Sequence, residues 1–300
     1  MKLKDKVGVW NINFQDKERY SHEAKHDIPL ERKTFNRRRY PFISGHTTKH
    51  DVNTFEVVVL ADQFIPEVDK FKAKIKIAHL EEPHSVVPHI YQYTLLNHSK
   101  FDLIITSDEQ FVGFNEKFVY APVGMSMLKR KDFKIYDKSK NVSIVASKKN
   151  WLVGHTLRHE VIRELGHKID GVKQGDPVEY KMPWMKDFRY SIAIENCIRN
   201  SYFTEKIMDC FKTGTIPIYW GCDVVNDVFN PDGILTFSSL SELSDILDNI
   251  SPRDYEGRMD AIEDNFYRAD EYLHDYDWMW QNGIKELWEK HKKEWRSPFA

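Results

Sequence analysis

Polar side chains that could hold a phosphorylated ligand gather in the stretch 190–222. Its hydrophobic pattern predicts a buried strand that ends at Glu195, a loop, a helix that begins at Thr204, and a second strand that ends before Gly221. Ligands of α/β sheets bind at the carboxyl ends of strands and at helix N-termini. The polar residues at these two places are Asn196, Tyr202, Glu205 and Lys206.

Lys206 falls in the first turn of the expected helix, where the helix dipole favours anions over cations. A cation at this place is explained if one bound anion contacts both the lysine and the N-terminus of the helix. Thr204 is the expected N-cap of the helix. The side chains expected to pack against the sheet are Phe203, Ile207, Cys210 and Phe211.

The segment from Glu195 to Gly221 reads ENCIRNSYFTEKIMDCFKTGTIPIYWG. It closely resembles the donor-binding signature of the glycosyltransferase family 10 α-1,3-fucosyltransferases, in which a strand ending in E-N is followed by Y-x-T-E-K-I and then by G-x-x-P-I-Y-x-G. The internal spacing is preserved over about thirty positions, which makes the match specific. A weaker resemblance extends back through SIVASKKNWLVGHTLRHEVIRELG, and the first half of the chain scarcely matches.

The resemblance implies an α/β protein of GT-B fold, with two Rossmann-like domains facing across a cleft and GDP-fucose held by the C-terminal domain. By position, Asn196, Tyr202, Glu205 and Lys206 would contact the nucleotide sugar, and Arg158 would pair with its pyrophosphate. A guanidinium and an ammonium can neutralise the charge that builds on departing GDP, so neither a metal nor another cofactor is expected. Glu205 is suited to accept hydrogen bonds from sugar or ribose hydroxyls.

An inverting transfer also needs a general base for the acceptor hydroxyl. The family resembled here carries this carboxylate in the N-terminal domain, in an E-x-P context at a strand end. The segment KIKIAHLEEPHS offers Glu81 in that register and Glu82 directly before Pro83. Because side chains alternate along a strand, we expect only one of the two to point into the cleft, and the register favours Glu81.

Short apolar runs alternate with helical patterns along the chain, which indicates an α/β fold. A charged stretch at 129–140 has no periodicity, and we place the domain boundary there, giving an acceptor-binding domain at 1–133 and a nucleotide-sugar-binding domain at 134–300. The expected strands are 7–14, 55–61, 74–80, 102–107, 118–122, 142–147, 190–195, 215–220 and 234–237. The expected helices are 155–165, 204–213 and 240–249, with stops at Gly166 and Gly214 and a capping-box pattern of Ser239 with Glu242.

The tail carries a stripe of aromatic residues among lysines and glutamates, including Trp278, Trp280, Trp288 and Trp295. We expect a final helix that docks on the body of the protein, with a return to the first domain as one alternative. Tryptophan flanked by lysine is also typical of helices at a membrane surface, so peripheral membrane contact through this helix stays open.

The composition excludes several classes of protein. The chain has 300 residues, 41% hydrophobic and 30% charged, which indicates a folded protein. The 44 Lys and Arg against 46 Asp and Glu leave a net charge of −2, so a nucleic-acid-coating role is disfavoured. The cysteines form no disulfide or zinc pattern, and neither a signal peptide nor a membrane-spanning run is apparent, so we expect a cytoplasmic protein. Its oligomeric state stays open.

Motifs of other enzyme classes are missing. No Walker loop and no G-x-G-x-x-G follows a strand, which disfavours ATPases and dinucleotide oxidoreductases. The histidine pairs His46 with His50 and His155 with His159 lack a third ligand at a natural spacing, so no metal site is predicted.

These observations predict an inverting, metal-independent transfer of L-fucose from GDP-fucose to a hydroxyl of a glycan acceptor, in the hexosyltransferase class of glycan biosynthesis and protein glycosylation. Two alternatives stay open. The first is a glycosyltransferase that uses a different nucleotide sugar. The second is a non-catalytic protein that binds a sugar nucleotide or a glycan.

Overall fold

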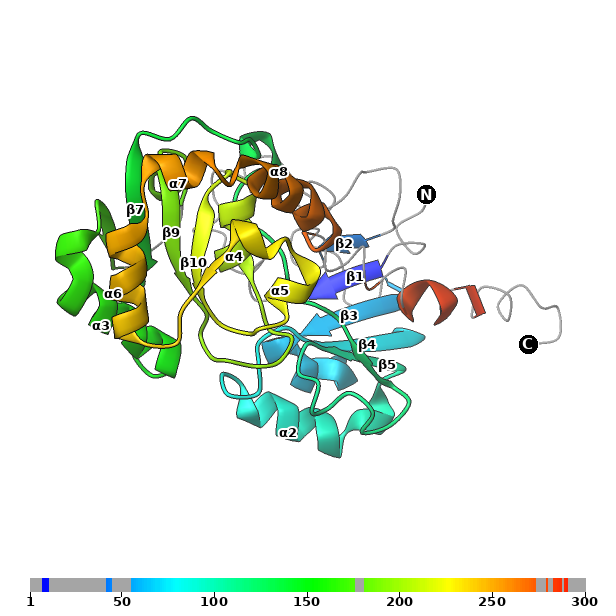
Figure 1. Cartoon of the computed structure of the whole chain (residues 1–300). Coiled ribbons are helices and arrows are strands. Elements are labelled where there is room, and N and C mark those ends of the chain that lie inside the picture. The colour runs from blue at the N-terminus through cyan, green and yellow to red at the C-terminus, as the bar shows by residue number, and fades with distance from the viewer. Residues whose placement is uncertain are drawn as a thin grey trace. The chain divides into compact units, whose positions relative to one another are not determined.

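The chain folds into two units, each built around a parallel sheet (Figure 1). Unit 1 comprises Met1–Pro122 and His274–Ala300, and unit 2 comprises Val123–Leu273. The computed structural model describes residues 55–175, 181–273, 279, 283–287 and 289–290, together with the backbone of 7–10 and 42–44.

Unit 1 contains a six-stranded sheet in the order β2-β1-β3-β4-β5-β6, in which every neighbouring pair is parallel. The central strand β3 reads VVVLA and is buried at every position, as expected for a parallel strand covered on both faces. The strands are Val7–Trp10 (β1), Phe42–Ser44 (β2), Val57–Ala61 (β3), Ile75–Leu80 (β4), Leu103–Thr106 (β5) and Phe118–Tyr120 (β6).

Two helical segments lie on one face of this sheet, a 3₁₀ helix at Asp62–Lys70 and α2 at Pro88–Leu96. The sequence analysis did not predict α2, since its apolar residues do not follow a single helical stripe. Its buried residues include Ile90 and Tyr91. The other face of the sheet packs against residues from near the end of the chain, Met279 and Ile284.

Unit 2 contains a five-stranded parallel sheet in the order β11-β10-β9-β7-β8. The chain runs from β7 to its neighbour β8 and then crosses to β9 on the other side of β7. This reversal places a switch point between β7 and β9, where ligands of such sheets bind. The strands are Lys140–Ala146 (β7), Gly171–Gln174 (β8), Phe188–Ile194 (β9), Ile216–Trp220 (β10) and Leu235–Thr236 (β11).

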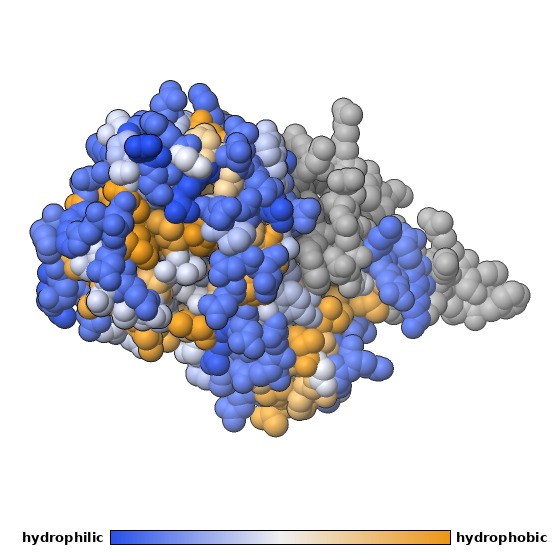
Figure 2. Space-filling view, in the orientation of Figure 1, coloured by the Kyte–Doolittle hydropathy of each residue, from blue (hydrophilic) through white to orange (hydrophobic). Residues whose placement is uncertain are grey.

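Helices cover both faces of the unit 2 sheet (Figure 1). Side chains of α3 and α6 pack on one face, and those of α4 and α5 pack on the other. Hydrophilic residues cover much of the face seen in Figure 2, with hydrophobic patches between them. The helices are Val153–Leu165 (α3), Glu205–Phe211 (α4), Val225–Val228 (α5), Leu240–Asn249 (α6), Pro252–Glu256 (α7) and Met259–Arg268 (α8).

The structure divides the chain at Pro122, ahead of the boundary that the sequence places after residue 133. Residues 123–133 join unit 2 because they bond to it. The Ser126 hydroxyl and the Met127 amide donate to the Asp209 carboxylate at 2.6 and 2.9 Å. These contacts are long-range, so the charged composition of 129–140 could not show them.

Several local predictions are confirmed in unit 2. Helix α3 ends before Gly166, and α4 begins after Thr204, whose side chain accepts from the Lys206 amide. The four residues predicted to pack from this segment all lie in one buried cluster: Phe203, Ile207, Cys210 and Phe211. Helix α4 is shorter than predicted, because residues 212–214 form a turn in which Gly214 has φ +67°.

The predicted aromatic stripe of the tail falls largely outside the described residues, which include none of Trp278, Trp280, Trp288 and Trp295. Membrane contact through this helix therefore stays a prediction. Across the part of the chain that the structure describes, no helix combines the length and the apolar character needed to cross a bilayer.

Ser239 caps α6, and replacing it by alanine should cost about 1 kcal/mol of unfolding free energy. The Ser239 hydroxyl accepts from the Glu242 amide at 3.2 Å, while the Glu242 carboxylate accepts from the amide of the preceding Ser238 at 2.7 Å. Urea unfolding of Ser239→Ala measures the loss. Ser241→Ala, at an exposed position inside the same helix, is the matched control and should be close to neutral. Equal effects of the two changes would contradict the capping role.

Candidate active site

The residues predicted to bind a donor converge at the switch point of the unit 2 sheet. Glu195 and Asn196 directly follow β9, Arg158 projects from α3, and the α4 N-terminus brings Glu205 and Lys206. Hydrogen bonds and ion pairs connect these elements. The structure therefore brings together residues from separate parts of the sequence at the place where such sheets bind ligands.

Glu195 is the centre of this cluster and is completely buried. Its carboxylate accepts from the Thr204 amide at 2.8 Å and from the Thr204 hydroxyl at 2.8 Å, and it pairs with Lys206 Nζ at 3.1 Å. A buried carboxylate is stable only when it is paired and hydrogen-bonded in this way. Glu195 thus ties the end of β9 to the start of α4.

The ion pairs of Lys206 explain how a cation is accommodated in the first turn of α4. The ammonium lies 3.1 Å from Glu195 and 3.3 Å from Glu205, so two carboxylates offset the unfavourable helix dipole. The position of Lys206 predicts a shared anion here, but the sequence does not identify that anion as Glu195. The E-N string contained the signal, because a charged residue at the end of a buried strand needs a partner.

Arg158 holds the end of β9 from the other side. Its Nε donates to the Ile194 carbonyl at 3.0 Å, and its Nη2 donates to the same carbonyl and, at 3.0 Å, to Asn196 Oδ1. Burial lowers the pKa of Arg158 from its ordinary value, while the charges of Glu195 and Glu205 act in the opposite direction. Within the described part of the chain, Nη1 makes no hydrogen bond.

Glu205 lies between two lysines. Its Oε1 is 3.3 Å from Lys206 Nζ and 3.3 Å from Lys181 Nζ. Burial by itself would raise the pKa of Glu205, but the charges of Lys206 and Lys181 outweigh burial and hold the pKa well below its usual range. Glu205 is therefore ionised at neutral pH and is a hydrogen-bond acceptor.

Lys181 also pairs with the buried Asp209 at 3.0 Å, and Asp209 binds the 126–127 segment described above. Lys181 and Asp209 are not among the residues predicted from the sequence. No local pattern marks them, since Lys181 precedes a short 3₁₀ turn and Asp209 lies inside α4. Their role in holding Glu205 exists only in the folded chain.

The remaining predicted donor residues also lie in this region. Tyr202 is 3% exposed and precedes α4, and its amide donates to the Arg199 carbonyl at 3.2 Å. Asn196 is half-buried and receives the Arg158 bond. All five predicted donor-binding residues are thus placed at or beside the carboxyl edge of the sheet.

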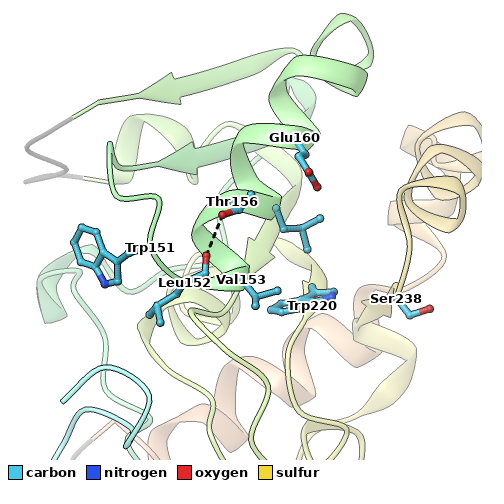
Figure 3. Close-up of a pocket in the computed structure, with 8 residues that line it drawn as sticks. Trp151, Leu152, Val153, Thr156, Glu160, Trp220 and Ser238 are labelled. Carbon is cyan, nitrogen blue, oxygen red and sulfur yellow. Dashed lines mark hydrogen bonds between the residues drawn. The ribbon is translucent and has the colours of Figure 1, made fainter. Parts of the chain in front are cut away.

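A hollow of about 550 Å³ opens beside the first turns of α3 (Figure 3). None of the five predicted donor-binding residues lines it. Helix α3 therefore turns Arg158 toward β9 and a different side toward this hollow, where Thr156 bonds to the Leu152 carbonyl at 3.3 Å. The lining residues are Trp151, Leu152, Val153, Thr156, Leu157, Glu160, Trp220 and Ser238.

The candidate base residues lie in unit 1, just past the end of β4 at Leu80. Glu81 is 7% exposed and Glu82 is half-buried. Neither residue is part of the strand, so strand alternation does not determine where their side chains point. Both backbone amides donate to the Asp62 carboxylate instead, at 3.1 Å from Glu81 and 3.3 Å from Glu82.

The structure describes one of the two histidine pairs. His159 Nε2 lies 2.9 Å from the Lys149 carbonyl, and burial together with the charge of Arg158 lowers the pKa of His155 to about 4. His46 and His50 lie outside the described residues. Among the described residues, no three His, Cys, Asp or Glu side chains are grouped as a metal site requires.

Two parallel α/β units with a polar cluster at the carboxyl edge of the second are typical of GT-B glycosyltransferases, and a structural comparison confirms the predicted GT-B fold class. A solved α1,3-fucosyltransferase superposes with a TM-score of 0.54 at 18% identity, over 95% of this chain and 90% of that one. An α1,3-fucosyltransferase with GDP-fucose gives a TM-score of 0.50 at 20% identity, over 87% and 81% of the two chains.

Part of the sequence matches a known family and its members. Residues 135–257 match the family "Glycosyltransferase family 10 (fucosyltransferase) C-term", which confirms the predicted resemblance over most of unit 2. The α-(1,3)-fucosyltransferase FucT of Helicobacter pylori is 32% identical over 76 residues, which cover 25% of this chain. The aligned segment spans only 16% of that relative's length.

Gly154 lies where α3 comes closest to the residues that follow β9. A Cβ on Gly154 would clash with the Glu195 carbonyl oxygen, and the Gly154 amide donates to the Asn196 carbonyl at 3.1 Å. Gly154→Ala should therefore lower the unfolding free energy by about 2 kcal/mol or more. Urea unfolding tests this, with Gly166→Ala as the control, because a Cβ there meets nothing within 4 Å. Similar stability of the two variants would show that α3 can move away from β9 at little cost.

Proposed function

We propose that this chain is an inverting, metal-independent glycosyltransferase that moves L-fucose from GDP-fucose to a hydroxyl of a glycan acceptor. The observation that carries the proposal is the convergence of Arg158, Glu205 and Lys206 at the switch point of the unit 2 sheet, within the segment that matches the fucosyltransferase family. The relative with GDP-fucose supports the choice of donor.

The donor side of the mechanism is electrostatic. GDP leaves with its negative charge increased as the glycosidic bond breaks, and fixed cations stabilise that charge in the transition state. Arg158 supplies Nη1, and Lys206 supplies an ammonium held between two carboxylates. Ionised Glu205 accepts hydrogen bonds from sugar or ribose hydroxyls. Asn196 and Tyr202 complete the contacts with the nucleotide sugar.

These cations perform the part that a divalent metal plays in other transferases, which supports metal independence. We propose unit 2 as the nucleotide-sugar-binding domain and unit 1 as the acceptor-binding domain. On the acceptor side, Glu81 or Glu82 removes the proton of the acceptor hydroxyl as its oxygen attacks the anomeric carbon from the face opposite GDP. The product would then have the inverted anomeric configuration, which NMR of the product can establish.

Calorimetric titration with GDP, UDP, CDP and ADP in EDTA tests the donor. We expect GDP alone to bind tightly, and Lys206→Met to weaken it about 10- to 100-fold, because hydrogen bonds to charged groups contribute about 1.5 to 3 kcal/mol. Lys168→Met is the matched control. Lys168 is also an ion-paired lysine of unit 2, bonded to Asp248 at 2.6 Å, but it is not part of the cluster.

Preference for another nucleotide would favour the rival donor, and a strict need for added metal would contradict metal independence. Thermal unfolding of Lys206→Met must accompany the titration, because this change leaves Glu195 buried without its cation.

Transfer assays on Glu81→Gln and Glu82→Gln identify the base. Loss of a general base should lower kcat about 10²- to 10⁴-fold and leave the Kd for GDP within about twofold of the unmodified protein. Glu67→Gln, at an exposed surface ion pair in unit 1, is the control and should retain full activity. If neither glutamate matters, the base lies elsewhere. If the unmodified protein binds GDP but never transfers sugar to a glycan panel, the non-catalytic alternative is favoured.

A further inference from the structure

Asp62 combines two costly features at the carboxyl end of β3. Its side chain is 4% exposed, and its backbone has φ +40°, in the left-handed region that non-glycine residues rarely adopt. Burial and the nearby charge of Glu82 raise the pKa of Asp62 to about 8. A buried acid on a strained backbone persists only where the surrounding structure requires it, and such residues cluster at functional sites.

The hydrogen bonds of Asp62 take the place of β3–β4 ladder hydrogen bonds beyond the end of β3. Strand β3 pairs with β4 as far as Ala61 and His79, so the backbone amides beyond that point have no ladder partner on β3. Asp62 Oδ1 accepts from the Glu81 amide at 3.1 Å and from the Glu82 amide at 3.4 Å. One carboxylate oxygen thus holds two consecutive peptide groups, those of the two candidate bases.

Tyr91 of α2 holds the same turn from its other side. Its hydroxyl donates to the Glu82 carbonyl at 3.2 Å and lies 3.0 Å from the Thr106 hydroxyl of β5. The ring of His84, two residues after Glu82, packs edge-on against the Tyr91 ring at 5.3 Å. The backbone of Glu82 is therefore bonded at its amide by Asp62 and at its carbonyl by Tyr91.

We propose that Asp62 is a positioning residue that fixes the Glu81–Glu82 turn, so that the base carboxylate points at the acceptor hydroxyl. This inference rests on the proposed function, in which one of these glutamates is the base. Asp62 acts through the two peptide groups and does not itself take the proton. Misplacing a reacting group by about 1 Å is enough to slow an enzyme about 100-fold.

Three substitutions separate the hydrogen bonds of Asp62 from its backbone conformation. Asp62→Asn keeps Oδ1, the oxygen that reaches both amides, and asparagine tolerates a positive φ. Asp62→Gly tolerates the positive φ but removes the acceptor. Asp62→Ala removes the acceptor and strains the backbone. Comparing the glycine and alanine variants therefore shows how much of any effect comes from strain.

We expect Asp62→Gly to lower kcat about 100-fold and Asp62→Asn to stay within about fivefold of the unmodified protein, with the Kd for GDP unchanged in both. Rescue by asparagine would show that the hydrogen bonds matter rather than the charge. Normal kcat in a folded Asp62→Gly protein would overturn the proposal, as would equal losses in the asparagine and glycine variants.

A double-mutant cycle with the base distinguishes positioning from a general structural effect. If Asp62 acts through the base, Asp62→Gly should cost almost nothing further once the base is already glutamine, because the two changes remove one function. Full additivity would overturn the proposal. If the glycine variant does not fold, Tyr91→Phe replaces it in the same cycle, since it removes the hydroxyl from the Glu82 carbonyl and keeps the ring.

The outcomes also separate this inference from the proposed function. Absence of transfer by the unmodified protein would reject the proposed activity, and full activity of both glutamine variants would reject the base together with Asp62 as its positioning residue. Transfer that depends on a glutamate but not on Asp62 would reject the positioning role alone.

Discussion

The buried carboxylate of Glu195 is the interaction on which the candidate site depends. A charge with no solvent exposure at the end of β9 has to be compensated, and the Thr204 amide and hydroxyl with the Lys206 ammonium are what compensates it. That requirement fixes where α4 begins relative to the sheet. It also holds Lys206 beside Glu205, and with them the charge pattern that the proposed donor would meet.

Buried carboxyl groups also accept hydrogen bonds from backbone amides at other turns of the chain. Asp62 accepts the amides of Glu81 and Glu82, and Asp209 accepts the Met127 amide. In each case a buried carboxyl group accepts hydrogen bonds from backbone amides that lie outside the helices and strands. Such carboxyl groups bind irregular segments to the elements that support them. This property is useful where a loop must hold reacting groups in a fixed position.

Sequence reasoning was most successful where the information is local. Short apolar runs predicted most of the parallel strands, although not β2 and β8. Residue type predicted the Thr204 cap and the Gly166 stop, and one continuous string carried the family resemblance in unit 2. It was weakest where partners are distant along the chain. The domain boundary moved to Pro122 because of bonds from Ser126 and Met127 to Asp209, more than eighty residues away. Helix α2, with no single apolar stripe, was not predicted.

The sequence by itself determined the fold class and singled out the predicted donor-side residues, because strand periodicity, helix caps and the spacing of one motif are all encoded within short segments. Only the tertiary structure decided which groups surround them. Lys181 reaches Glu205 and Asp209 from outside α4, and Asp62 reaches Glu81 from just past the end of β3. The physical reason is that a buried charge finds its partners through the packing of the sheets, and packing joins residues that no local pattern connects.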